Sequence, residues 1–379
     1  MNRKGILLAG GAGVLFNHIF ILSIAILVPS VFLLQKSLTN LSMIVYIGIA
    51  SIYSVYTRTI FNVDLNFHDG AAIVLCMSIF SYCCRHVNYI KSQSYFTYIF
   101  IFFLIFSIWG GIYFGNFYFG SGLLNFRLLG LTTNPNQMAL YALCILLIVR
   151  GSVIGPFRKY SMQLICILAG ALSGSDAFFV SIIVIFVFSL FWEFGKKNIT
   201  SFIVVACAFL LTAYLNIEFS RIELDTQSFE RFNRWIYALK IYSEYPYVIL
   251  FGLGPGGYGP GFDSTFLDYI DFSSGVEISG TEFHNSFFDF MTSFGGLGFL
   301  IFYIFIKRNL RNLSITPEFL GLIVFSMFHL VYRHPIFWLA LIFALQSNLN
   351  FRGTLQKSSA CVPDVNARQA SLIHETTKA

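Results

Sequence analysis

The sequence predicts an all-α polytopic integral membrane protein with about twelve transmembrane helices, eleven being the alternative. Hydrophobic residues make up 56% of the 379 residues and charged residues only 11%, whereas about a quarter of the residues of a soluble domain are charged. The 24 basic and 18 acidic residues sum to +6 and fall in a few clusters. This composition excludes a soluble enzyme, a disordered chain and a nucleic-acid-binding module.

Long apolar runs define the predicted spans, because about 20 apolar residues cross a bilayer and lipid offers the backbone no hydrogen-bond partners. The runs are 41–57, 70–84, 95–114, 136–149, 160–172, 177–194, 199–217, 287–306, 317–332 and 335–347. The stretch 5–34 is also apolar and fits either one tilted span or two short ones. Two spans there give the total of twelve.

Basic residues in the short loops set the orientation, since cytoplasmic loops are rich in Lys and Arg. They occupy alternate loops, at Arg85, Lys91, Arg150, Arg158, Lys159, Lys196, Lys197, Lys307, Arg308 and Arg311. We therefore expect residues 1–349 to form one transmembrane domain of a bacterial inner membrane, followed by a disordered cytoplasmic tail, 350–379. The periplasmic side would receive 115–135, the turn 173–176 and one long loop, 218–286, which carries short helices.

The long loop contains a predicted amphipathic helix at 229–244, whose apolar positions, including Trp235, recur at helical spacing. This helix is either a packing lid or lies on the outer membrane surface with its aromatic rings in the interface. Arg231 and Arg234 are three residues apart and therefore share a face. Two guanidinium groups on one face could hold a phosphate group at the membrane surface.

A glycine-rich segment, GLGPGGYGPG, follows at 252–261. Gly252, Gly254 and Gly257 formally match GxGxxG, but a dinucleotide site needs a strand before this motif and a helix after it. The two prolines within the segment argue against that context. The glycines are then either a structural turn or a segment that passes close to a ligand.

His284 and Asn285 stand immediately before the apolar run 287–306. Asn285 or Ser286 is expected to cap the helix formed by that run. The positive end of a helix favours neutral imidazole, which can accept a proton, and His284 is therefore the candidate base. The other histidines, including His329, are assigned no role.

Arg127 is the only cation in the loop 115–135, which is otherwise rich in aromatic residues, leucine and glycine. An arginine at the membrane surface with no adjacent carboxylate suggests an anionic partner. Asn134 is expected to cap the next helix and Pro135 to begin it. The turn 173–176 is expected to cap its following helix through a serine or through Asp176.

Taken in order along the chain, these features resemble the O-antigen polymerase and O-antigen ligase family of bacterial inner-membrane glycosyltransferases. The resemblance extends from about Phe126 through the last spans. It is carried by Arg127 with Gly130 and Asn134-Pro135-Asn136, the Ser-Gly-Ser turn at 173–175, Arg231 four residues before Trp235, Pro246, the glycine-rich segment, and His284-Asn285 ahead of Phe294-Gly295-Gly296-Leu297-Gly298. Asp176 is a departure, because the family often has an arginine after this turn.

The resemblance implies that a glycan carried on undecaprenyl pyrophosphate is transferred to a sugar hydroxyl at the outer face, without nucleotide sugar, metal or other cofactor. Arg127 and Arg231, with Arg234 as a third, would stabilise charge on the pyrophosphate leaving group. His284 would accept the proton of the attacking hydroxyl. Three asparagines are candidates for orienting sugars, although capping explains them equally well: Asn134, Asn136 and Asn285.

Four interpretations of function stay open at this point. A polymerase, which extends the glycan on its lipid carrier, is the first. A ligase, which moves the glycan onto the lipid A core, uses the same donor. A lipid-linked glycan transporter is less favoured, since few charges lie in mid-span and no internal repeat is evident, and a purely structural membrane protein is the fourth. Expected partners are the lipid-linked oligosaccharide and membrane lipids, with a chain-length regulator protein as a further candidate and no nucleic acid.

Three substitutions test the assigned residues: Arg127→Ala, Arg231→Ala and His284→Ala. Each is expected to leave a folded, membrane-inserted protein that no longer builds or transfers polymer, because each removes a charge or a base. Gels of surface polysaccharide, with immunoblots of the membrane fraction as the control for insertion, measure this. Normal polymer in all three variants would contradict the assignment.

Overall fold

The computed structural model describes residues 45–53, 73, 76–77, 79–84, 86, 90–91, 94–118, 127–132, 134–193, 235, 238–255, 285–310 and 315–345. The predicted spans 5–34 and 199–217 lie outside the described residues, as does the tail 350–379. The count of eleven or twelve spans and the boundary of the transmembrane domain therefore stay predictions.

The described chain is mostly helical. Its helices are α5 (Ser94–Tyr113), α6 (Pro135–Gly151), α7 (Pro156–Leu172), α8 (Asp176–Glu193), α11 (Tyr247–Phe251), α13 (Ser286–Asn309), α14 (Pro317–Phe328) and α15 (Pro335–Leu345). They coincide with predicted apolar runs, except for α11, which is a short helix in the predicted long loop 218–286. Of the helices described, α5 and α13 are long and apolar enough to cross a membrane. Shorter apolar helices occupy Pro135–Gly151, Asp176–Ser189, Pro317–Phe328 and Pro335–Leu345.

One small sheet departs from the all-α prediction. Strands β1 (Phe117–Tyr118) and β2 (Arg127–Leu128) pair antiparallel, with Tyr118 opposite Arg127. The ladder forms because the chain turns back after α5, where Gly115 adopts a positive φ of 63°. Its consequence is that the backbone of Arg127 is anchored beside the end of α5.

Among the helices that the structure describes, three begin at a residue whose short polar side chain caps the helix. The Asn134 side chain accepts from the backbone of Asn136 at the start of α6. Asn285 accepts from two backbone N–H groups at the start of α13, and Thr316 caps α14. The predicted capping roles of Asn134 and Asn285, with Pro135 as the first residue of α6, are confirmed.

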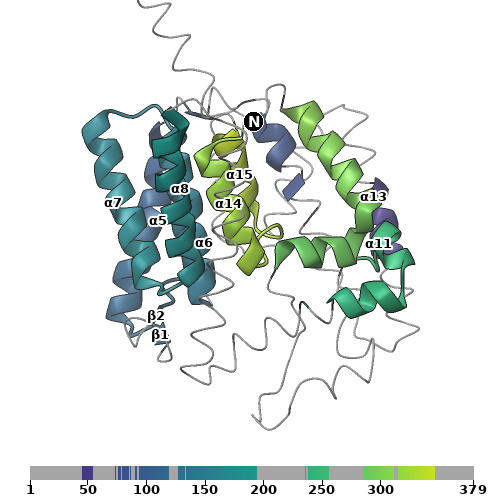
Figure 1. Ribbon diagram of the computed structural model, residues 1–379. Helices are drawn as coiled ribbons and strands as arrows, with labels where there is room; N and C mark the ends of the chain where they lie inside the picture. Colours follow the sequence, from purple (N-terminus) through teal and green to yellow (C-terminus); the bar gives the residue numbers. More distant parts are fainter. Residues whose placement is uncertain are drawn as a thin grey trace, which may run out of the picture.

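The centre of the bundle is formed by α6, α14 and α15. Every residue of α15 is buried, and α6 is buried along most of its length. Helix α14 packs against α8, α15 against α6, and α6 also against α7. In Figure 1, α14 and α15 lie between α6, α7 and α8 on one side and α13 on the other. Apolar helix contacts in lipid are stabilised by van der Waals packing rather than by water exclusion.

Basic residues that the sequence places in cytoplasmic loops gather at one end of the bundle. Arg150, at the end of α6, forms an ion pair with Glu318 at the start of α14, with Nη2 2.9 Å from Oε1. The Lys159 ammonium donates to the Ser152 carbonyl nearby, at 3.3 Å. Burial, and then the charge of Lys159, lower the pKa of Lys91 to about 8. These contacts agree with the hairpin arrangement inferred from the loops.

Helix α13 is broken at Gly295, which has φ 62° and ψ −173°. The helix predicted for 287–306 is present but kinked: Figure 1 shows two segments of α13 that meet at an angle beside α11. Three carbonyls just before the break accept hydrogen bonds from outside the helix. The bonds are Leu253 N to Thr292 O at 2.7 Å, Gly254 N to Ser293 O at 2.8 Å, and Tyr46 Oη to Phe294 O at 2.8 Å.

Two glycines permit this junction. Gly252 and Gly295 both have positive φ, at 74° and 62°. A Cβ atom on Gly252 would collide with the Ser293 carbonyl, and one on Gly295 with the Leu250 carbonyl. The start of the glycine-rich segment therefore packs directly against the backbone of α13. For Gly252 and Gly254 this supports the structural-turn interpretation rather than an approach to a ligand.

Gly252→Ala and Gly295→Ala are each expected to destabilise the protein by at least about 2 kcal/mol, because a positive φ is costly for alanine and the backbones must separate. Gly48→Ala is the matched control, since Gly48 is helical and a Cβ added to it would meet no other part of the structure within 4 Å. This substitution should be neutral or stabilising by up to about 1 kcal/mol. Thermal unfolding of the purified protein in detergent measures all three. Equal melting temperatures across the set would contradict this account.

Candidate functional site

Arg127 is held by two acceptors from different parts of the chain. Its Nε donates to the Ser173 carbonyl at 3.1 Å, and its Nη2 donates to Asn136 Oδ1 at 2.8 Å. Both of these acceptors are neutral oxygens, and the two bonds together fix the orientation of the guanidinium plane. The predicted cation is therefore fixed between the start of α6 and the turn that joins α7 to α8.

The asparagines at the start of α6 have separate tasks. The oxygen of Asn134 caps the helix, accepting from Asn136 N at 2.8 Å, whereas the oxygen of Asn136 accepts from Arg127. For Asn134 and Asn285 the cap uses the side-chain oxygen, which leaves the amide N–H groups as the donors for any sugar. Asn136 is a positioning residue for Arg127 in this geometry.

The α7–α8 turn continues the polar contacts toward α14. Gly174 has a positive φ of 61° and lies against the Arg127 side chain. The next residue, Ser175, is buried, and its hydroxyl is 3.5 Å from Nε2 of His329. Asp176 is exposed at the first turn of α8, where a carboxylate is favoured by the helix dipole.

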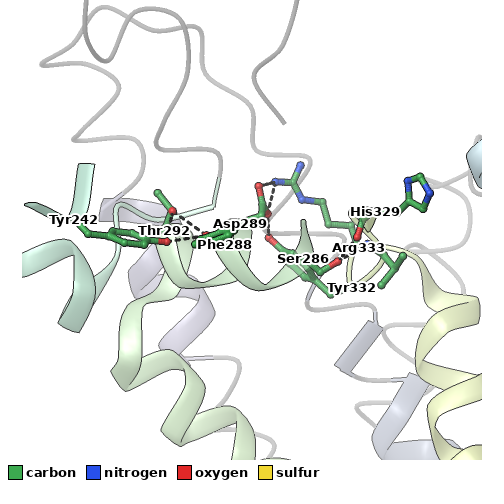
Figure 2. A network of polar contacts seen from close by, with 9 residues as sticks. Tyr242, Ser286, Phe288, Asp289, Thr292, His329, Tyr332 and Arg333 are labelled. Atoms are coloured by element: carbon green, nitrogen blue, oxygen red, sulfur yellow. Dashed lines mark hydrogen bonds and ion pairs between the residues drawn. The ribbon is translucent and has the colours of Figure 1, made fainter. Parts of the chain in front are cut away.

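The turn between α14 and α15 is bonded to the first turn of α13. Ser286 Oγ donates to the His329 carbonyl at 2.6 Å and accepts from Val331 N at 2.8 Å. Figure 2 shows Ser286 and Asp289 on the same helix, facing the turn that carries His329, Tyr332 and Arg333. The starts of α6, α8, α13 and α15 are thus joined in one end of the bundle, which we call the outer end.

Asp289 is the most deeply buried charge of the outer end, with 0% of its side chain exposed. The Arg333 guanidinium forms an ion pair with it, at 3.1 Å from Nη2 to Oδ2, and the Tyr332 hydroxyl donates to the same oxygen. Burying a lone carboxylate is strongly unfavourable. Arg333, Tyr332 and the positive end of α13 together offset that cost.

The predicted helix within 229–244 packs on protein where it is described. The Trp235 ring contacts the rings of Phe288 and Phe328. Tyr242 Oη donates to the Phe288 carbonyl at 3.1 Å and bonds to Thr292 Oγ1 at 2.9 Å. Burial raises the pKa of Tyr242 to about 12, so its hydroxyl stays protonated. These contacts support the packing-lid interpretation, although Leu239 on the same helix is exposed.

The structure brings only some of the predicted site residues together. Arg127 and Asn136 meet directly, and Asn285 lies beside Ser286 in the same outer end. Three predicted residues lie outside the described residues: Arg231, Arg234 and His284. Among the residues described, no group of three metal-ligating side chains lies together.

Sequence reasoning missed three residues of the outer end: Asp289, His329 and Arg333. A signal for Arg333 was present, because it follows a span in a short loop on the predicted periplasmic side, where cations are scarce. The same argument singled out Arg127. His329 and Asp289 had no such signal, since their importance depends on contacts with residues more than 40 positions away.

The fold and this polar end define a helical protein with apolar, membrane-type helices and a charged site at one end. Residues 162–303 match the model of a family described as O-antigen ligase. The match confirms the resemblance to the O-antigen polymerase and ligase family over that part of the chain, and indicates a membrane protein of polysaccharide biosynthesis. No curated protein matches the chain. Arg231, Arg234, His284 and Asn285 fall within the matched residues, and Arg127 precedes them.

Ser286→Ala is expected to destabilise the protein by about 2 kcal/mol or more, because it leaves the buried Val331 N–H and His329 carbonyl without these hydrogen bonds. Ser161→Ala is the control: that hydroxyl bonds to the Phe157 carbonyl on an exposed helix surface, and its loss should change stability by less than about 0.5 kcal/mol. Thermal unfolding in detergent compares them. An unchanged melting temperature for Ser286→Ala would contradict the proposed bonding of the two turns.

Proposed function

We propose that this protein is an O-antigen polymerase. It transfers a glycan from undecaprenyl pyrophosphate to a sugar hydroxyl of another lipid-linked repeat, at the periplasmic face of a bacterial inner membrane. The observation that carries the proposal is the placement of Arg127, whose guanidinium is oriented by Ser173 and Asn136 at the end of the bundle that also holds the start of α13. The match of residues 162–303 to the O-antigen ligase family supports a glycan transfer of this kind.

The chemistry assigns each group one task. The bond between the anomeric carbon of the glycan and its pyrophosphate oxygen breaks as the acceptor oxygen forms the new glycosidic bond. His284, which directly precedes the cap residue of α13 in the chain, accepts the proton of that hydroxyl. Arg127 and Arg231, with Arg234, stabilise the charge left on undecaprenyl pyrophosphate. No nucleotide sugar or metal takes part in this scheme, and a chain-length regulator protein is a proposed partner.

Two other functions have a specific observation in their favour. The printed family description names a ligase, and a ligase uses the same donor with the lipid A core as acceptor. A broken helix with a buried carboxylate is a feature of transporters, and α13 has both. In this chain, however, the carbonyls at the break accept backbone hydrogen bonds and Asp289 is ion-paired. These contacts favour a rigid catalytic site over a transporter that changes conformation.

Lipopolysaccharide banding from a strain that lacks the gene tests the proposal. A polymerase predicts cores capped with a single repeat and no ladder, because attachment persists while extension is lost. Complementation with the intact gene is the control and should restore the ladder.

The other banding patterns identify the alternatives. Uncapped cores, with polymer still held on the lipid carrier, would contradict a polymerase and indicate the ligase. An unchanged ladder would contradict both and direct the next test to another surface glycan or to transport.

A further inference from the structure

The outer half of α13, Ser286–Phe294, cannot take its orientation from the rest of its helix. The break at Gly295 separates it from the remaining turns, and a helix this short is marginal by itself. Its position must therefore come from contacts made by other segments. The structure shows such contacts at both of its ends.

At the break, the outer half is held by backbone bonds from Leu253 and Gly254. At its start, it is held by the α14–α15 turn, through Ser286 and through the ion pair of Asp289 with Arg333. The same turn reaches the α7–α8 turn, where His329 lies 3.5 Å from Ser175. That second turn accepts the hydrogen bond from Arg127 through Ser173.

These contacts form an unbroken path between the two sides of the outer end. Arg127 lies at one end of the path and the first turn of α13 at the other. We propose that Asp289 and Arg333 are positioning residues, which fix the outer half of α13 in register with Arg127 so that groups on both sides act on one substrate. The proposal rests on the proposed glycan transfer and adds the part of the chain that sets its geometry.

The geometry argues against Arg333 binding the pyrophosphate itself. Its Nη2 is committed to both oxygens of Asp289, at 3.4 and 3.1 Å, and only 17% of its side chain is exposed. The pair is formally neutral, so it attracts a phosphate group far less than an arginine with neutral partners does. A wholly buried carboxylate, in contrast, needs its cation to stay in place.

The ion pair at the opposite end of the bundle is a matched control. Arg150 and Glu318 are 2.9 Å apart and, like the outer pair, join helices distant in sequence. Substituting either pair should lower the melting temperature. Only the outer pair should affect the chemical step, because only it contacts the outer half of α13.

The test uses the purified full-length protein and a synthetic polyprenyl-pyrophosphate-linked oligosaccharide as donor. Asp289→Asn and Arg333→Ala are expected to lower kcat by about 10- to 100-fold, the range that a small misplacement of reacting groups produces, with KM for the donor changed less than about 3-fold. Arg333→Lys should recover most of kcat, since one nitrogen makes the contact and an ammonium can replace it. Glu318→Gln and Arg150→Ala should leave kcat within about 2-fold of the starting value.

Three results would overturn the proposal. One is an unchanged kcat in Asp289→Asn, whose shape matches the original residue and which decides the question if Arg333→Ala does not fold. Another is a rise in KM with kcat unchanged, which would place Arg333 on the donor. The third is an equal loss of kcat in the control pair. His284→Ala and Arg127→Ala in the same assay separate the two proposals: activity in both would contradict the transfer mechanism itself.

Discussion

The break in α13 at Gly295 is the constraint on which the outer end depends. A chain in a low-dielectric environment must satisfy every backbone carbonyl, because each one left unbonded costs several kcal/mol. The break therefore requires donors from elsewhere, and Leu253, Gly254 and Tyr46 supply them. This requirement explains why the start of the glycine-rich segment 252–261 must pack against the break in α13, and why neither Gly252 nor Gly295 tolerates a side chain.

The charged residues at the two ends of the bundle have different partners and different degrees of burial. At one end, Arg150 and Glu318 join two helix termini in a partly exposed pair, as expected of a loop side rich in basic residues. At the outer end, Arg127 is oriented by neutral acceptors while Asp289 and Arg333 neutralise each other. A buried and mutually neutralised pair such as Asp289 and Arg333 holds structure in place.

Local features of the site were predictable and long-range ones were not. The caps at Asn134 and Asn285 depend on bonds two or three residues apart, so the residue type and the following apolar run predict them. Arg127 was predictable because a lone cation in an aromatic loop is unusual. The sequence could not decide whether the helix around Trp235 packs on protein or lies in the membrane interface, because the amphipathic pattern is the same in both cases. In the structure the Trp235 ring packs on protein.

By itself, the sequence determined that this chain has apolar, membrane-type helices, where most of them lie and which loops carry the basic residues. Composition and periodicity suffice for this, because lipid leaves the backbone few alternatives. The tertiary structure alone decided that α13 is broken, that Asp289 pairs with Arg333, and that His329 connects two turns. Those features depend on the donors and charges that packing brings within reach, and no spacing along the chain specifies them.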